Sequence, residues 1–344
     1  MARIGLIGYF GSGAYSDDLI EHVTKRLLLE QRGDLVFDST LLSRGEAASN
    51  PDYLNSFDLL VHCGGSLLGK CTHYPIRDIA KWAGKLKTPL VTFGIGYRYE
   101  PDKEPLAPEM RERIRLLFEK SSVISVRGEY TVKHLQENGI DTSKISSLAD
   151  PVVACDIPLY KSSQYIGGNV RDMPPVEIQH ASTNHVHKLF AECYDWLIDT
   201  YDLPLNLISF RHNIDTDNDV KGADKVISLM RNKHRASRAV PPDYLEAVKL
   251  LGGARFYFGQ RLHPTVYAAT QGIPFVGVEY QFDKMLDWAS TVGINNVIHT
   301  GTADLDSFIN AHERVEANMA KLRSTIPLKA AEIRATAKKI VELI

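Results

Sequence analysis

Short apolar runs alternate with amphipathic helical patterns along the chain, and this alternation restricts the fold more than any other feature. Arg3–Tyr9 has the pattern of a buried strand, and the apolar positions of Leu19–Glu30 fall on one face of a helix. Strands separated by helices at this spacing form a parallel α/β sheet with both faces covered. The pattern predicts further strands at Asp34–Phe37, Asp58–His62, Pro89–Phe93, Ser122–Val126, Gln164–Val170, Leu205–Phe210, Ala254–Phe258 and Pro274–Val278, with helices at Pro75–Leu86, Glu109–Lys120, Glu129–Asn138, Asn184–Thr200, Pro242–Leu251, Pro264–Gln271, Phe282–Val292, Ala303–Leu322 and Pro327–Ile344.

The alternation is interrupted near the middle of the chain by Asp150-Pro151 and Pro158, and a new strand begins at Gln164. We therefore predict an N-terminal α/β domain over residues 1–157, a C-terminal α/β domain over residues 158–325 and a C-terminal helix over residues 326–344. Two such domains place a cleft between the carboxyl ends of their strands, where ligands of α/β folds bind.

Charge and cysteine content exclude several classes of protein. The 344 residues carry 40 Lys+Arg against 42 Asp+Glu, a net charge of −2, which argues against a general nucleic-acid binder. The four cysteines (Cys63, Cys71, Cys155 and Cys193) form neither a disulfide framework nor a CxxC pair for structural zinc. No apolar run fits a signal peptide or a membrane span, so we expect a soluble, cytoplasmic protein.

Two glycine segments follow predicted strands. Gly8-Tyr-Phe-Gly11-Ser-Gly13 lacks the GxGxxG spacing of a dinucleotide site, and it is either a turn or a place where backbone approaches a ligand, with Asp17-Asp18 capping the next helix. Gly64-Gly65-Ser66 is either a tight turn or a loop whose amides hold a hydroxyl or phosphate. Gly11, Asp17, Gly64, Gly65 and Ser66 are our candidates for acceptor or cleft loops.

Three other polar segments favour structural interpretations. His185 and His187 lie two positions apart on a predicted helix, so they point in different directions and cannot chelate one ion. The segment from Asp215 to Asp219 resembles the start of a calcium loop, but Val220 and Val226 stand where glycine and glutamate are needed. It is better explained as a polar loop that caps the next helix and can face the cleft, and we predict no metal site. The basic segment 231–238 is a solvated loop or, as the alternative, a docking patch for an anionic acceptor or lipid.

Cations gather at the ends of predicted strands. Arg127, Arg171 and Arg211 each end a strand, while Arg261 and His263 follow a fourth. In a parallel sheet such residues converge on one edge, where they would hold a compact dianion that combines phosphate and carboxylate. Any single arginine can instead pair with a local acid, as Arg127 would with the nearby Glu129.

Taken in order, these segments resemble the polysaccharide pyruvyl transferase family. The clearest match runs from Arg261-Leu-His263 through Gly272-Ile-Pro274 to Tyr280 and Lys284. The supporting segments are Gly64-Gly65-Ser66, Gly94-Ile-Gly96, Ile124-Ser-Val-Arg127-Gly-Glu129 and Asp150-Pro151. The chain departs from the family at Ala14-Tyr-Ser16, where an Asn and a Gly are missing before the two acids. This departure bears on the acceptor side more than on the donor side.

The resemblance implies a GT-B-like fold, in which two Rossmann-like domains face each other across a cleft. It also implies transfer of a pyruvyl group from phosphoenolpyruvate to a sugar of a surface polysaccharide or its precursor, which forms a pyruvate ketal without a cofactor. Arg127, Arg261, His263 and Lys284 match the family's donor-binding residues, and we add Arg171 and Arg211. His263 and Arg261 are the catalytic candidates, with His263 as the acid or as a hydrogen-bond donor to phosphate.

Two other functions remain alternatives. The first is a nucleotide-sugar glycosyltransferase of the same fold, in which Glu279 would hold the ribose. The second is a non-catalytic binding relative, which the altered Ala14–Ser16 segment favours. Whether the saccharide acceptor is lipid-linked, whether the protein contacts a membrane peripherally and which oligomer it forms are left open.

Overall fold

A computed structural model describes residues 1–11, 14–39, 49–69, 74–100, 103–155, 163–173, 182–212, 215, 217–280 and 283–344. The chain divides into two compact units. The N-terminal unit contains Met1–Ser12, Asp17–Cys155 and Pro327–Ile344, and the C-terminal unit contains Gly13–Ser16 and Asp156–Ile326. Gly13, Cys71, Phe282 and the predicted boundary between residues 157 and 158 lie outside the described residues.

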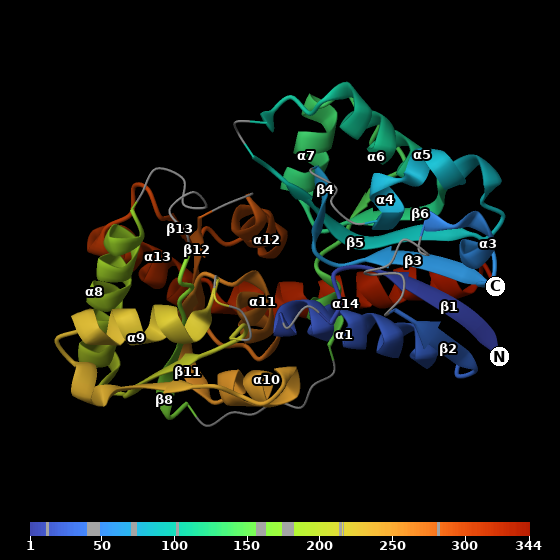
Figure 1. The fold of residues 1–344 in the computed structure, drawn as a ribbon. Helices are drawn as coiled ribbons and strands as arrows, with labels where there is room; N and C mark the ends of the chain where they lie inside the picture. The colour runs from blue at the N-terminus through green and yellow to red at the C-terminus, as the bar shows by residue number, and fades with distance from the viewer. Residues whose placement is uncertain are drawn as a thin grey trace. The chain divides into compact units, whose positions relative to one another are not determined.

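The N-terminal unit is built on a parallel sheet (Figure 1). In the part that the structure describes, this sheet has seven strands: six follow the order β2-β1-β3-β5-β6-β7, and the seventh, β4, pairs with β5. This is the flavodoxin-like order, which reverses direction between β1 and β3. The strands are β1 (Ala2–Ile7), β2 (Leu35–Asp38), β3 (Leu59–Cys63), β4 (Ser66–Gly69), β5 (Leu90–Arg98), β6 (Ser121–Val126) and β7 (Ser146–Ser147), and the helices are α1 (Tyr15–Gln31), α3 (Pro51–Leu54), α4 (Tyr74–Arg77), α5 (Ile79–Trp82), α6 (Pro108–Lys120) and α7 (Glu129–Glu137).

The C-terminal unit contains six parallel strands among its described residues, in the order β10-β9-β8-β11-β12-β13. This is the 3-2-1-4-5-6 order of the Rossmann fold, and it reverses between β8 and β11. Figure 1 shows α8 and α13 on one side of these strands and α11 and α12 on the other. The strands are β8 (Tyr165–Asn169), β9 (Leu205–Ile208), β10 (Ala236–Ala239), β11 (Ala254–Gly259), β12 (Phe275–Glu279) and β13 (Val297–His299), and the helices are α8 (Thr183–Tyr201), α9 (Asp219–Leu229), α10 (Tyr244–Gly252), α11 (Leu262–Thr270), α12 (Lys284–Val292) and α13 (Leu305–Ala317). The last helix, α14 (Met319–Val341), begins in this unit and belongs to the N-terminal unit from Pro327 onward.

Buried apolar side chains explain why these runs became strands and helices. Leu60, Leu90 and Ile95 come from central strands of the N-terminal unit, and they share a core cluster with Trp82 of α5 and Leu117 of α6. Burial of each large apolar side chain contributes about 1.5–3 kcal/mol. The sheet of this unit therefore packs against its helices through an apolar core.

Three element predictions were wrong. The predicted helix Pro75–Leu86 breaks at Asp78, whose backbone leaves the helical region at φ −105° and ψ 17°. The last two helices divide at Asn318, not near residue 325, and α14 continues through Pro327. The basic segment 231–238, interpreted as a loop, overlaps the edge strand β10, which begins at Ala236. None of the helices in the described ranges is both long and apolar enough to cross a membrane.

Candidate anion-binding site

The predicted arginines of the C-terminal unit follow its central strands. Arg171 lies two residues after β8, Arg211 three residues after β9, and Arg261 two residues after β11. Because β9, β8 and β11 are parallel neighbours, these residues lie at the same carboxyl edge of the sheet. Arg171 and Arg261 also flank the point where the strand order reverses, which is where α/β sheets bind ligands.

Arg261 is held by two buried aspartates. Its Nε lies 2.9 and 3.0 Å from the two carboxylate oxygens of Asp219, and its Nη2 lies 2.6 Å from Asp219 Oδ1. The same Nη2 donates to the backbone oxygen and to Oδ1 of Asp217, each at 3.0 Å. Burial opposes the charge of Arg261, but Asp219 and Asp217 outweigh it and raise the pKa of the guanidinium above its ordinary value.

Asp217 is shared by all three arginines of this edge. Besides Arg261, it accepts from Arg171 Nε and, at 3.0 Å, from Arg211 Nη1. Burial raises the pKa of Asp217, but the charges of Arg261, Arg171 and Arg211 prevail and lower it to about 2. The carboxylate is therefore ionised at neutral pH and lies at the centre of a cationic site.

Asp219 has a different role, because it binds backbone as well as arginine. Its Oδ2 accepts from Asn169 Nδ2 at 2.8 Å and from the amides of Phe210 and Arg211 at 2.8 and 3.1 Å. The preceding Asn218 caps α9 by accepting from the amides of residues 220 and 221. The helix-capping prediction for this loop is confirmed, but the sequence analysis missed both aspartates as members of the site.

Tyr280 joins Lys284 to the arginines. The Arg171 Cζ and the Lys284 Nζ each lie 4.5 Å from the centre of the Tyr280 ring, in cation–π geometry. The Lys284 Nζ also contacts the Tyr280 hydroxyl, and Lys284 is the first residue of α12. The name "basic cluster" is used below for Arg171, Arg211, Arg261 and Lys284. The family motif had singled out Tyr280 and Lys284, and the structure brings both to this cluster.

His263 lies in the first turn of α11, two residues beyond Arg261. It is 7% exposed, and Arg261 is the N-cap residue of the same helix. The backbone amides of a helix's first turn favour anions. The residues from Arg261 to His263 thus place a guanidinium group and an imidazole at the N-terminus of α11.

Arg127 belongs to the other unit, where it follows β6. Its Nε lies 2.9 Å from Asp150 Oδ2, with both side chains buried, and its amide donates to the Ile95 oxygen at 2.9 Å. An acid does pair with Arg127, but it is the distant Asp150 and not the neighbouring Glu129, which begins α7. The Asp150-Pro151 motif therefore positions this arginine.

The predicted glycine loops follow β1 and β3, on the two sides of the reversal point of the N-terminal sheet. Gly64 and Gly65 have φ of +72° and +71°, which favours glycine, and Ser66 opens β4. The Gly11 amide donates to Asp18 Oδ1 at 2.9 Å. Asp17 and Asp18 lie within the first turn of α1, which starts at Tyr15, so they do not precede the helix as a cap would.

The histidine pair and the basic segment behave as local structure. On α8, His185 is exposed and His187 is buried, in agreement with their different directions. Within the described ranges, no group of three His, Cys, Asp or Glu side chains has metal-ligand geometry. In the basic segment, Arg231, Arg235 and Arg238 pair with Asp199, Asp202 and Asp224.

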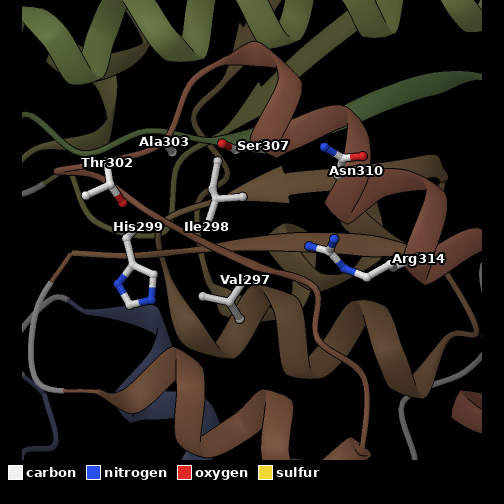
Figure 2. Close-up of a pocket in the computed structure, with 8 residues that line it drawn as sticks. All are labelled: Val297, Ile298, His299, Thr302, Ala303, Ser307, Asn310 and Arg314. Carbon is white, nitrogen blue, oxygen red and sulfur yellow. The ribbon is translucent and has the colours of Figure 1, made fainter.

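A separate pocket of about 320 Å³ lies between β13 and α13 (Figure 2). Its described lining residues include none of those predicted from the sequence. They are Val297, Ile298, His299, Thr302, Ala303, Ser307, Asn310 and Arg314. The candidate site therefore rests on the basic cluster and not on this pocket.

The two sheets define a GT-B-like protein built from two Rossmann-like units, and solved structures share this fold. The chain matches MnaA of S. aureus with UDP at 14% identity and a TM-score of 0.61, covering 100% of this chain and 98% of the other. UDP-GlcNAc 2-epimerase of Neisseria meningitidis bound to UDP-GlcNAc matches at 14% identity and a TM-score of 0.61, covering 100% of this chain and 99% of the other. HepE of Anabaena with UDP-glucose matches at 14% identity and a TM-score of 0.57, covering 100% of this chain and 97% of the other.

The family is shown by sequence. A family model named polysaccharide pyruvyl transferase matches residues 17–281, and the chain belongs to this family. The matched range contains Arg127, Arg171, Arg211, Arg261, His263 and the Gly64–Ser66 loop, whereas Lys284 and the loop with Gly11 lie outside it. No functionally curated protein matches the chain significantly.

Proposed function

We propose that the protein transfers the pyruvyl group of phosphoenolpyruvate to two hydroxyls of a sugar in a surface polysaccharide or its precursor. The observation that carries this proposal is the basic cluster, which gathers Arg171, Arg211, Arg261 and Lys284 at one sheet edge. Phosphoenolpyruvate has a carboxylate and a phosphate on the same carbon, C2, and guanidinium groups bind both with paired hydrogen bonds.

The reaction balances without a redox partner. One sugar oxygen adds to C2 of phosphoenolpyruvate while C3 gains a proton and becomes a methyl group. The bond between C2 and the phosphate oxygen then breaks, and the second sugar oxygen adds to C2. Of the two hydroxyl protons, one replaces the proton given to C3 and the other leaves with inorganic phosphate.

In this proposal His263 supplies the proton to C3 as a general acid and regains one from a hydroxyl as a general base. Arg261 and Lys284 stabilise the charge on the departing phosphate, and Arg171 and Arg211 hold the carboxylate. Arg127, which Asp150 orients, is a further donor ligand by family resemblance. The loops with Gly11, Asp17 and Gly64–Ser66 are assigned to the acceptor.

A nucleotide-sugar glycosyltransferase is the competing function, and it would use Glu279 to hold the ribose. The Glu279 Oε2 accepts from the amides of Met285 and Leu286 at 2.7 and 3.3 Å, so this carboxylate caps the first turn of α12. That engagement favours a structural role for Glu279. The likeness to UDP-bound structures is a likeness of fold.

The proposal is tested by turnover. The protein is incubated with phosphoenolpyruvate and an extract of envelope-sugar precursors, and phosphate release is followed together with the mass of the acceptor. We expect release that depends on the acceptor, with a product that gains one pyruvyl ketal. His263→Asn should lose about 100-fold or more in rate, the range for general acid–base groups. The control variant is His185→Asn, an exposed histidine of the same unit, which should turn over like the wild type.

Two results would contradict the proposal. One is glycosyl transfer from a uridine-diphosphate sugar with phosphoenolpyruvate inert. The other is unchanged turnover in His263→Asn, which would remove the imidazole from the mechanism.

A further inference from the structure

Asp217 receives the contacts that a bound anion would receive. Three guanidinium groups from three different strand ends converge on this single carboxylate. Its side chain is 12% exposed, so the pairs are largely shielded from water. An anion placed where these three guanidinium groups meet would take the position of the Asp217 carboxylate.

The charges of the site favour replacement of Asp217 by a more negative group. The four cations of the basic cluster face two carboxylates, those of Asp217 and Asp219, which leaves an excess of two positive charges. Phosphoenolpyruvate carries about three negative charges near neutral pH, with up to about two on the phosphate. If it takes the place of Asp217, the cations and anions balance, whereas adding it beside Asp217 leaves an excess of negative charge.

The two aspartates also differ in how the chain holds them. Asp219 is the first residue of α9 and is fixed by Asn169 and two backbone amides. Asp217 lies outside the helix in the left-handed region at φ +60°, an uncommon conformation for a residue other than glycine. The backbone amide of Asp217 donates a hydrogen bond to the backbone oxygen of Asp172 at 3.1 Å. The carboxylate of Asp217 is thus carried by a turn, and the carboxylate of Asp219 by a helix.

We propose that the Asp217 carboxylate occupies the binding position of the donor's anionic group and leaves it when the donor binds. Asp219 stays in place and orients Arg261 throughout. This inference rests on the proposed function for the identity of the donor, but the exchange itself requires only an anion with the charge and size of phosphate or carboxylate.

Calorimetric titration of Asp217→Asn tests the exchange. Asparagine keeps the side-chain shape, tolerates the left-handed backbone and removes the competing charge. Dissociation constants for inorganic phosphate and for phosphoenolpyruvate are measured at fixed ionic strength. We expect both to fall roughly tenfold or more, because an internal competitor is removed. Asp215→Asn, an exposed aspartate two residues away, is the charge control, and it should bind both anions as the wild type does.

A structural role for Asp217 predicts the opposite sign. If Asp217 serves to position the arginines, Asp217→Asn will bind both anions more weakly, as we expect for Asp219→Asn. Weaker or unchanged binding in Asp217→Asn would therefore overturn the proposal. Tighter phosphate binding without a gain for phosphoenolpyruvate would support the exchange and count against the donor assignment.

A second measurement does not depend on a stable variant. Wild-type crystals are grown with phosphoenolpyruvate, or with phosphate if phosphoenolpyruvate does not bind. The exchange predicts an anion on Arg171, Arg211 and Arg261, with the Asp217 carboxylate moved off at least two of them. An anion bound elsewhere, or one bound while all three Asp217 pairs persist, would refute it.

Discussion

At the scale of single residues, this protein is organised by pairs of buried charges. Arg127 with Asp150, and Arg261 with Asp217 and Asp219, are pairs whose partners lie apart in the sequence. Breaking such a pair strands a buried charge and typically costs about 3–5 kcal/mol. The aspartates therefore hold the arginines in fixed positions, and in doing so they partly neutralise the groups that would bind substrate.

The pKa of Asp217 leads to a prediction about acid stability. Its pKa falls from 3.8 to about 2 on folding, so the stabilisation is complete above pH 3.8 and is lost as the pH falls through about 2. The shift corresponds to about 2 kcal/mol of unfolding free energy. Urea unfolding between pH 5 and pH 2 should show this loss in the wild type and in Asp215→Asn. In Asp217→Asn the loss should be smaller by that amount, and an identical pH profile in all three proteins would contradict the assignment.

The cations at strand ends could be predicted from the sequence, because an apolar run that stops at an arginine marks the place where a strand leaves the core. The partner of each cation could not be predicted. Asp150 is 23 positions from Arg127, and Asp219 is 42 positions from Arg261. The nearest acid in sequence, Glu129, is not the partner of Arg127. The available signal for Asp217 and Asp219 was the alternation of aspartates just before a helix. It was interpreted as a helix cap that can face the cleft, and neither aspartate was named as a site residue.

At the scale of elements, long apolar patterns gave correct strands and helices, whereas short or polar elements were missed. β10 has four residues and lies at the sheet edge, where Ser237 and Arg238 are exposed, so it has no apolar run. α14 continues through Pro327 because one buried stripe extends past the proline, and tertiary packing outweighs the local penalty. That stripe is formed by Leu322, Ile326, Ala330, Ile333, Ala337 and Ile340.

The loop after β3 is expected to require glycine at position 64, and a substitution there tests this requirement. At Gly64 a side chain would require φ of +72°, and its Cβ would lie 2.5 Å from Ile20 Cγ2. Gly64→Ala should therefore lower the free energy of unfolding by about 2 kcal/mol or more. The matched control is Gly33→Ala, where an added Cβ meets no atom within 4 Å. Chemical denaturation of both variants measures the difference, and equal stabilities would mean that the loop adapts to a side chain.

At the scale of the whole molecule, each of the two sheets has a point where its strand order reverses, the place where α/β sheets typically bind ligands. The sequence predicted two α/β domains, and the structure contains two parallel-sheet units of the Rossmann-like kind. The exchange of segments between them was not predictable from local pattern. Pro327–Ile344 belongs with the N-terminal unit and Gly13–Ser16 with the C-terminal unit, although neither segment has an apolar signal that distinguishes its unit.

The contacts of Tyr15 explain why the segment Gly13–Ser16 belongs to the C-terminal unit. It is buried, its amide donates to the Phe210 oxygen at 3.1 Å, and its hydroxyl donates to the Pro241 oxygen at 2.9 Å. Both bonds lie within the C-terminal unit, and Tyr15 itself belongs to the stretch in which the sequence departs from the family. The altered Ala14–Ser16 segment therefore includes a residue that packs near the end of β9.

The most direct test of the donor assignment is a thermal titration with phosphoenolpyruvate beside inorganic phosphate and uridine diphosphate. A ligand at 100 times its dissociation constant adds about 2.7 kcal/mol to the folded state. We predict a much larger rise in Tm with phosphoenolpyruvate than with phosphate. The rise should vanish in Arg261→Lys, which loses paired hydrogen bonding, and persist in Arg255→Lys, an arginine at the opposite end of the same strand. Stabilisation by uridine diphosphate alone, or equal stabilisation by phosphate and phosphoenolpyruvate, would contradict the account.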